Sequence, residues 1–291
     1  MSNKIKILFI VNPISGIGKQ NKFEEILKNN IDYQRFDVEI SYTQYAGHAV
    51  EIAKNAVNKY DVVTAVGGDG SINEIASQLQ NTETALAVIP CGSGNGFART
   101  FNIPLKPDLA IKFLNKAQFR KIDTCLINDK FFISIAGVGF DSLVARKYEE
   151  MPTRGFKTYF KAGFNSFFKY KEVEYTLIYN GKEEKCKAFL ITACNSQQYG
   201  YDFKIAPNAK TDDGLLDIAI VHRPPLYRIP FTAISVMSGH ANNSKYIDII
   251  QAEELIIKGN DCGFINLDGE TIKCEGDLVF KTRKQNLKML V

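Results

Sequence analysis

The feature that most constrains this chain is the alternation of strand-like and helix-like segments over its first hundred residues. Each short run rich in β-branched residues is followed by a stretch with apolar residues three and four apart, which is typical of a parallel sheet with crossover helices. Such sheets bind ligands at the carboxyl ends of their strands. Strands are predicted over residues 4–11, 36–42, 61–66 and 85–89, and helices over 19–30, 46–60 and 71–80.

Three loops that follow these strands carry unusual residue clusters. NPISG (12–16) follows the first strand, GGDGS (67–71) the third and PCGSGNGFAR (90–99) the fourth. Glycine in such loops permits close approach of the backbone, so that amide N–H groups at the start of the next helix can point at a phosphate. One such loop alone is more often structural, but three at one sheet edge predict a polyphosphate site.

Two common nucleotide-binding folds do not match these loops. The chain has no Walker lysine (GxxxxGK[ST]), and no GxGxxG follows the first strand, which disfavours a P-loop NTPase and an ordinary dehydrogenase. The carboxylate of Asp69 would repel a phosphate unless it served a metal or hydrogen-bonded the loop. A magnesium role is one hypothesis for Asp69, and capping of the helix that opens at Ser71 is the alternative.

The second half of the chain is dominated by consecutive β-like runs from Phe119 onward, with a hairpin signal at Asn180-Gly181. A length of 291 residues suits two domains of roughly 150 residues each. Helix alternation ends near residues 116–120. We therefore predict an α/β nucleotide-binding domain over 1–120 and a β-rich domain over 121–291.

Several classes of protein are disfavoured by composition. The longest nearly apolar stretch, Phe131 to Phe140, is far shorter than the roughly 18 residues of a spanning helix, and the N-terminal apolar run indicates a strand and not a signal peptide. The six cysteines show no CxxC spacing and do not cluster with the three histidines, so we expect reduced thiols and no structural zinc. A net charge of +4 gives no sign of nucleic-acid binding. We expect a cytoplasmic protein.

These motifs, together with LDGE late in the chain, resemble those of the diacylglycerol kinase catalytic domain superfamily, which includes bacterial lipid kinases, sphingosine kinases and ceramide kinases. The resemblance covers nearly the whole chain. It implies an N-terminal parallel α/β nucleotide-binding lobe and a C-terminal β-sandwich lobe, with ATP and a lipid headgroup meeting between them. The matching segments, in family order, are NPxSG, Thr43 before GHA (47–49), GGDGSxNE (67–74), PxGSxNxFA (90–98) and LDGE (267–270).

The resemblance assigns site residues by motif. This sequence departs from the family pattern at Asn95-Gly96-Phe97, because bacterial diacylglycerol kinases typically have an acidic residue in place of Gly96. The acceptor of the phosphate is therefore left open between diacylglycerol and a long-chain base. The implied ATP-binding residues are Asn12, Pro13, Ser15, Gly16, Thr43, Gly67, Gly68, Asp69, Gly70, Ser71, Asn73, Glu74, Gly92, Ser93 and Asn95.

Two acidic turns in the second half are candidates for metal binding and catalysis. The residues Asp212-Asp213-Gly214 favour a turn between two strands. The resemblance implies a structural Mg²⁺ at this turn, held by the Asp213 carboxylate and the carbonyls of Lys210 and Leu215, with Asp217 nearby.

The second acidic turn is the LDGE segment, which brings two carboxylates close together. One of them could accept the proton of an acceptor hydroxyl during phosphoryl transfer. We assign the general base to Glu270, supported by Asp268, with Asp69 as the alternative. If the segment has no catalytic role, it is an ordinary Asp-Gly hairpin turn.

The segment 155–170 predicts a helix with phenylalanines on one face and lysines on the others. Its apolar stripe consists of Phe156, Phe160, Phe164 and Phe167. Packing in the core is the common explanation of such a stripe. The functional alternative is that part of the stripe lines an acyl-chain pocket while the lysines meet anionic headgroups.

The sequence as a whole predicts an ATP- and Mg²⁺-dependent lipid kinase acting on a hydroxyl of diacylglycerol or a long-chain base. A kinase of a soluble acceptor, similar to NAD kinase, and a nucleotide- or lipid-binding protein without catalysis are the alternatives. We expect a lipid substrate presented at a membrane surface, peripheral membrane contact and no nucleic-acid partner; a homodimer is left open.

Overall fold

The computed structural model describes the whole chain except residues 1–3, 16–22, 153–154 and 260–262. It divides into two compact units, which are described separately below. Unit 1 comprises residues 1–122 and 285–291, and unit 2 comprises residues 123–284. The strands β5 (Phe119–Ile127) and β16 (Leu278–Leu290) each run from one unit into the other.

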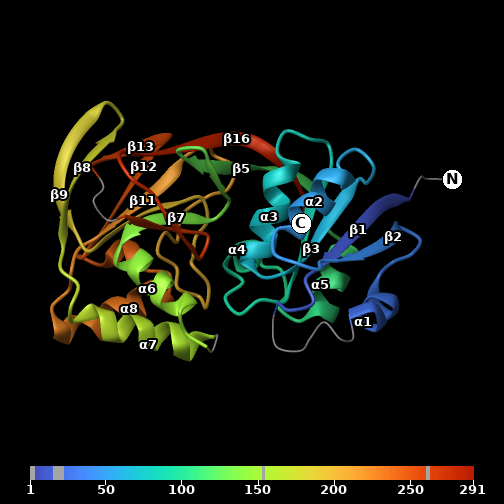
Figure 1. Cartoon of the computed structure of the whole chain (residues 1–291), viewed down its shortest axis with the longest axis horizontal. Helices are drawn as coiled ribbons and strands as arrows, with labels where there is room; N and C mark the ends of the chain where they lie inside the picture. Colours follow the sequence, from blue (N-terminus) through green and yellow to red (C-terminus); the bar gives the residue numbers. More distant parts are fainter. Residues whose placement is uncertain (1–3, 16–22, 153–154, 260–262) are drawn as a thin grey trace. The chain divides into compact units, whose positions relative to one another are not determined.

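Unit 1 is a parallel sheet flanked by helices, as the alternating sequence pattern predicts (Figure 1). The strand order is β2-β1-β3-β4-β16. Helix α1 contacts α5, and α2 contacts α3. Because right-handed crossovers place α1 on the opposite face from α2 and α3, both faces of the sheet are covered. The elements are β1 (Ile5–Val11), α1 (Phe23–Asn30), β2 (Phe36–Tyr42), α2 (His48–Ala56), β3 (Val62–Gly67), α3 (Asp69–Leu79), β4 (Ala85–Pro90), α4 (Gly96–Thr100) and α5 (Pro107–Leu114).

The strand order of unit 1 reverses direction between β1 and β3. From β1 the chain moves to β2 on one side, and it then returns to β3 and β4 on the other. At such a switch point the loops after the two adjacent strands leave toward opposite faces of the sheet, which opens a crevice at the carboxyl edge. The fold therefore directs attention to the loops after β1 and β3.

The C-terminal strand corrects the predicted domain boundary. Residues 285–291 were expected in the second domain, but Met289 pairs with Leu86 of β4 in a parallel arrangement. The side chains of Leu287, Met289 and Leu290 are buried there. Burial of these apolar side chains stabilises the strand within the first unit.

Unit 2 is a sandwich of two sheets, which confirms the expected β-rich fold. One sheet has six antiparallel strands in the order β12-β11-β10-β7-β14-β15. The second layer of the sandwich consists of β13, β8 and β9 together with β5, β6 and β16. Buried side chains from both sheets form one core, with Phe132 and Phe280 in edge-to-face contact. The strands are β6 (Lys130–Phe132), β7 (Ile135–Gly139), β8 (Val173–Tyr179), β9 (Lys182–Ala188), β10 (Leu190–Cys194), β11 (Leu216–Val221), β12 (Ile247–Ala252), β13 (Glu254–Lys258), β14 (Phe264–Leu267) and β15 (Glu270–Lys273).

Helices lie on the outer face of the six-stranded sheet (Figure 1). None of the helices in the described parts of the chain is long and apolar enough to cross a membrane. The helical elements are α6 (Phe140–Glu149), α7 (Phe156–Phe167), the 3₁₀ turn η2 (Leu226–Arg228), α8 (Ile229–Met237) and the 3₁₀ turn η3 (Ala241–Asn243).

Helix α7 corrects the expected core packing of the phenylalanine stripe. Phe160 and Phe164 are 62% and 57% exposed, whereas Ala162 and Ser166 are buried. Phe167 turns inward instead, with its ring centroid 5.2 Å from that of Phe189. Ala162, Gly163 and Ser166 form the inner face of α7, because small residues allow close approach to α6. The side chains of Phe160 and Phe164 lie on the outside.

Candidate functional site

The loops predicted to bind phosphate lie next to one another at the carboxyl edge of the unit 1 sheet. Backbone hydrogen bonds continue between strands beyond their ends: Asn12 N–H donates to the carbonyl of Val66 at 3.1 Å, and Cys91 N–H to that of Gly67 at 2.8 Å. The Thr43 N–H donates to the carbonyl of Val11 at 2.9 Å. These bonds place the segments after β1, β2, β3 and β4 side by side.

The second and third glycine loops approach each other more closely than side chains would permit. A Cβ on Gly92 would lie 2.6 Å from the Cα of Gly68, and one on Gly68 would lie 3.3 Å from the Cα of Gly92. At Gly67 a Cβ would lie 2.6 Å from the Ser71 Oγ. Glycine is therefore required at this edge by packing.

The first and second glycine loops are joined by side chains. Asn12 Nδ2 donates to the Oγ of Ser71 at 3.2 Å. The Ser15 hydroxyl donates to the Asn12 carbonyl at 3.1 Å, which tightens the turn that contains Pro13. Gly16, the last residue of the motif, lies outside the described residues.

Asp69 has a different structural role from the helix cap considered for it. Helix α3 already begins at Asp69, and no side chain caps it. The Asp69 carboxylate instead accepts hydrogen bonds from the N–H groups of Gly96 at 3.3 Å and Phe97 at 3.2 Å. A negative charge is favourable at the start of a helix, so Asp69 holds the first turn of α4 against α3.

Asn95 supplies an acceptor that the protein does not satisfy. It has a left-handed backbone conformation with φ 51°, and its Nδ2 donates to the Gly92 carbonyl at 2.8 Å. Its Oδ1 is buried without a hydrogen-bond partner among the described residues. Since a buried unpaired polar atom is costly, this oxygen is a candidate contact for a ligand. Ser93 is exposed in the same loop.

The remaining predicted ATP-binding residues lie on or beside α3. Gly70 and Asn73 are in its first turns. Glu74 accepts a hydrogen bond from the backbone of Gly47, and partial burial raises its pKa above the usual range. This contact ties the GHA motif at the start of α2 to α3, so Glu74 has a structural partner apart from any nucleotide.

In unit 2 the predicted Asp-Gly turn forms a two-residue hairpin between β14 and β15. Asp268 and Gly269 have φ angles of 49° and 95°, as in a type I′ turn. The Asp268 carboxylate accepts three backbone hydrogen bonds, from Ile133, Ser134 and Ile135, at 2.8, 2.8 and 2.9 Å. These bonds interrupt the nearly apolar stretch from Phe131 to Phe140 between β6 and β7.

The two acidic residues of this hairpin are thereby distinguished. Asp268 is committed to the β6–β7 loop, and such donors stabilise its charged form. Glu270 begins β15, opposite Leu267, and is exposed. The hydrogen bonds therefore give Asp268 a structural function in this hairpin, whereas Glu270 follows the turn at the protein surface.

A buried polar cluster at the start of α6 was missed by sequence reasoning. Asp141 accepts from the Ser142 N–H at 2.8 Å, from the Tyr199 hydroxyl at 3.2 Å and from Asn266 Nδ2 at 3.5 Å. Burial raises the pKa of Asp141 to about 7, and these hydrogen bonds oppose the rise. A Cβ on Gly137 would lie 2.5 Å from the Asp141 Oδ2. A lone Asp after an apolar run gives little signal in the sequence.

The predicted metal turn is held in place by another buried carboxylate that the sequence did not reveal. Asp123 Oδ2 accepts from the Gly214 N–H at 2.6 Å, and Asp123 N–H donates to the Thr211 carbonyl at 2.6 Å. Asp213 is exposed, and its Oδ1 accepts from the Leu215 N–H at 3.1 Å.

The donors at this turn fit a hard divalent cation. The pKa of Asp217 is raised by burial and further by the charge of Asp213, while the charge of Lys210 lowers it. Two neighbouring carboxylates and backbone carbonyls are oxygen ligands of the kind that Mg²⁺ prefers. The described residues contain no group of three or more His, Cys, Asp or Glu side chains placed for a metal, so such a site depends on the carbonyls of Lys210 and Leu215.

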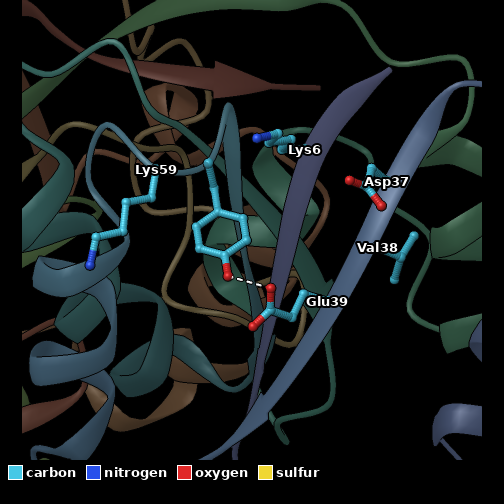
Figure 2. Close-up of a pocket in the computed structure, with 6 residues that line it drawn as sticks. Lys6, Asp37, Val38, Glu39 and Lys59 are labelled. Atoms are coloured by element: carbon cyan, nitrogen blue, oxygen red, sulfur yellow. Dashed lines mark hydrogen bonds between the residues drawn. The ribbon is translucent and has the colours of Figure 1, made fainter. Parts of the chain in front are cut away.

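A surface depression in unit 1 lies away from these loops, at the amino-terminal edge of the sheet (Figure 2). In it the hydroxyl of Tyr60 donates to Glu39, and this bond raises the pKa of Tyr60 to about 12. Its lining is polar and of mixed charge, with none of the glycine loops. The lining residues are Lys6, Asp37, Val38, Glu39, Lys59 and Tyr60.

Comparison with known proteins matches two family models to the chain. The diacylglycerol kinase catalytic domain matches residues 6–127, and the YegS C-terminal NAD kinase β-sandwich-like domain matches residues 134–290. A diacylglycerol kinase of Bacillus subtilis is 29% identical over 272 residues, covering 90% of this chain and 88% of the relative. A probable YegS-like lipid kinase of Yersinia enterocolitica is 31% identical over 232 residues, covering 76% and 77%.

The fold has a counterpart among solved structures. The crystal structure of a diacylglycerol kinase from Bacillus anthracis superposes with a TM-score of 0.74 at 20% sequence identity. The match covers 100% of this chain and 98% of that chain. At this identity the similarity shows the fold alone.

Proposed function

Because this chain belongs to the diacylglycerol kinase catalytic-domain family, we propose that it uses ATP and Mg²⁺ to phosphorylate a hydroxyl of diacylglycerol or of a related lipid such as a long-chain base. The observation that carries the proposal is the joining of three glycine loops at one sheet edge. Asn12 bonds to Ser71, Gly68 contacts Gly92, and Asp69 bonds to Phe97.

The nucleotide is proposed to bind at these loops in unit 1. Amides of the tight Gly68–Gly92 contact and the start of α3 would face the phosphates, since helix N-termini and glycine loops favour anions. The unpaired Oδ1 of Asn95 would accept from a donor group of the nucleotide or its hydration shell. Asp69 supports this site by fixing the position of α4, which keeps the two loops together.

Unit 2 is proposed to supply the base. The acceptor hydroxyl attacks the γ-phosphorus of ATP, a new P–O bond forms, the bond to the β-phosphate breaks, and ADP leaves. Glu270 would take the hydroxyl proton because its carboxylate is exposed beside the rigid hairpin. Asp268 would position that hairpin through its three backbone bonds.

Magnesium is proposed at two places. Phosphoryl transfer uses Mg²⁺ to neutralise charge on the phosphates, and a structural Mg²⁺ is proposed at the Asp213 turn, with the carbonyls of Lys210 and Leu215 as further ligands. The adjacent Asp213 and Asp217 charges support this second site.

A lipid surface is proposed as the place where the substrate is presented. The exposed rings of Phe160, Phe164 and Phe168 form a continuous row on α7, with neighbouring centroids 6.3 and 5.3 Å apart. Lys157 and Lys161 are exposed on the same helix. Aromatic rows flanked by lysines favour the interface of an anionic membrane.

The alternatives are less well supported. An acceptor like that of NAD kinase would leave the exposed aromatic row of α7 without a purpose, although the second family model is named for its NAD-kinase-like sandwich. A non-catalytic binding protein would leave the exposed Glu270 beside a rigid hairpin unexplained.

A phosphate-transfer assay with radiolabelled ATP tests the proposal. The acceptor panel contains diacylglycerol, monoacylglycerol, sphingosine, ceramide and NAD, with and without Mg²⁺. Mg²⁺-dependent label in at least one lipid supports the proposal, and the preferred lipid names the acceptor. Label in NAD alone would establish the soluble-acceptor alternative, and label in none would leave only the binding function.

A further inference from the structure

Helix α8 is apolar except for Thr232 and Ser235, and yet it is largely exposed. In soluble domains, a helix that is hydrophobic all round is normally buried. Here, α8 and the preceding turn η2 place five large apolar side chains in solvent, each between 45% and 70% exposed. They are Leu226, Tyr227, Phe231, Ile234 and Met237.

The two faces of α8 have different surroundings. Val236 is buried in a core cluster on the outer face of the six-stranded sheet, with Ala241 and Ile247. Phe231 and Ile234 lie three residues apart on the opposite side, where polar residues are expected in a surface helix. The docking of α8 in unit 2 therefore uses its inner face, and its outer face is exposed.

The surroundings of this outer face are basic. The segment from His222 to Ile247 contains no Asp or Glu, and it contains Arg223, Arg228 and Lys245. The Arg228 guanidinium lies 5.5 Å from the Tyr227 ring centroid. Asp248, the next acidic residue, is already bonded to His222 at 2.9 Å.

We propose that the α8 face, formed by Leu226, Tyr227, Phe231, Ile234 and Met237, inserts into the headgroup region of an anionic lipid bilayer. Apolar side chains with Arg228 beside them, in a segment of the sequence without Asp or Glu, match such a surface in both polarity and charge. The helix has nine residues, far fewer than the about 20 that a spanning helix needs, so α8 lies in the interface. The proposal rests on the proposed function in that a lipid kinase must reach a substrate that resides in a membrane.

Charge favours a lipid surface over a second copy of this chain. In a symmetric pair of α8 faces the same patch meets itself, so the positive charge of Arg228 would face an identical patch to which residues 222–247 contribute no carboxylate. Like charges brought together in this way oppose association. Anionic headgroups would instead pair with them.

Arg223, three residues before the α8 face begins at Leu226, contacts the end of α7. Its guanidinium lies 5.1 Å from the Phe167 ring centroid, and its Nη2 donates to the Phe167 carbonyl at 3.1 Å. Both helices belong to unit 2. Unit 2 would then have two apolar contacts with the membrane, the aromatic row of α7 and the α8 face.

Co-sedimentation with vesicles tests the inference. The vesicles are pure phosphatidylcholine or an equal mixture of phosphatidylcholine and phosphatidylglycerol. The double variant Phe231→Ser/Ile234→Ser should bind both kinds at least about tenfold more weakly, because apolar burial is lost. Arg228→Gln should weaken binding to the anionic vesicles alone. Leu109→Ser, which removes a 44% exposed apolar side chain from α5 in unit 1, is the control and should leave binding unchanged.

Two further measurements keep the outcomes distinct. Thermal melting should show the double variant as stable as the wild type, since both side chains are solvent-exposed. Kinase activity toward a short-chain, water-soluble diacylglycerol should also be retained, so that this assay reports on the proposed function independently of membrane contact. Unchanged vesicle binding by the folded double variant overturns the proposal, as does a change from dimer to monomer with vesicle binding intact.

Discussion

The side-chain amide of Asn195 donates to the carbonyl of Asp123 at 3.0 Å and to that of Ile133 at 2.8 Å. Asp123 holds the turn at Gly214, and the Ile133 N–H donates to Asp268. One buried amide therefore links the candidate metal turn to the acidic hairpin within unit 2. Displacement of either turn is expected to be felt at the other, because both bonds depend on the same side chain.

The contact between the glycine loops predicts the effect of adding one methyl group. In Gly92→Ala the new Cβ would lie 2.6 Å from the Gly68 backbone and 2.8 Å from the Asn95 Oδ1, so the loops must separate. We expect ATP binding, measured by calorimetry on folded protein, to fall at least about tenfold. Gly163→Ala adds the same methyl in ordinary contact with Val144 and should bind ATP normally. Normal affinity in Gly92→Ala would exclude this loop contact from the nucleotide site.

The hairpin of unit 2 predicts different losses for its two acidic residues. Glu270→Gln preserves size but removes the proton acceptor, so the rate of phosphate transfer should fall by about 100- to 10,000-fold with melting temperature and ATP affinity unchanged. Asp268→Asn places an amide among backbone donors, so it should lower the free energy of unfolding by about 1–3 kcal/mol as well as the rate. Kinetics and urea unfolding of both variants separate the two roles. If Glu270→Gln turns over lipid at nearly the wild-type rate, the base lies elsewhere, and Asp69 is the next residue to test.

The oxygen-rich turn predicts a metal-dependent contribution to stability. Chelation of Mg²⁺ should lower the melting temperature of the wild type, because a ligand bound only to the folded state stabilises it. Asp213→Ala should melt at the chelated temperature whether or not Mg²⁺ is present. Asp212→Ala removes the adjacent exposed carboxylate and should keep the response to Mg²⁺. A wild type indifferent to chelation would show that the segment is only a turn.

Asp141 predicts a pH-dependent stability that decreases toward neutral pH. Its folded-state pKa is raised to about 7, whereas in the unfolded chain the carboxyl titrates near pH 4. Between about pH 4 and pH 7 the folded protein therefore holds a proton that the unfolded chain has released, and the free energy of unfolding falls as pH rises. Urea unfolding across this range should show the slope in the wild type and a smaller slope in Asp141→Asn. Equal slopes in the two proteins would contradict the assignment.

The sequence predicted the features that are local or periodic. The alternation of strands and helices, the three glycine loops and the Asn180-Gly181 hairpin all follow from residue patterns within a few positions. The pairing of Met289 with Leu86 was not predicted, because nothing local in the last strand indicates a partner two hundred residues away.

The buried polar residues of unit 2 were also missed, for a related reason. Asp123, Asp141 and Asn195 belong to no local motif, and their partners come from distant segments. The exposure of Phe160 and Phe164 could not be predicted either, since helical periodicity gives a face but does not say what covers it.

The passage of the chain through unit 1, into unit 2 and back has a consequence for synthesis on the ribosome. Residues 1–122 emerge first, yet their sheet lacks the strand next to β4 until residues 285–291 have been made. Domains usually fold in the order in which they are translated. Here unit 1 is completed only after unit 2 has been translated, and β4 remains an open edge during that time. A nascent chain stalled before residues 285–291 would expose that edge to other chains.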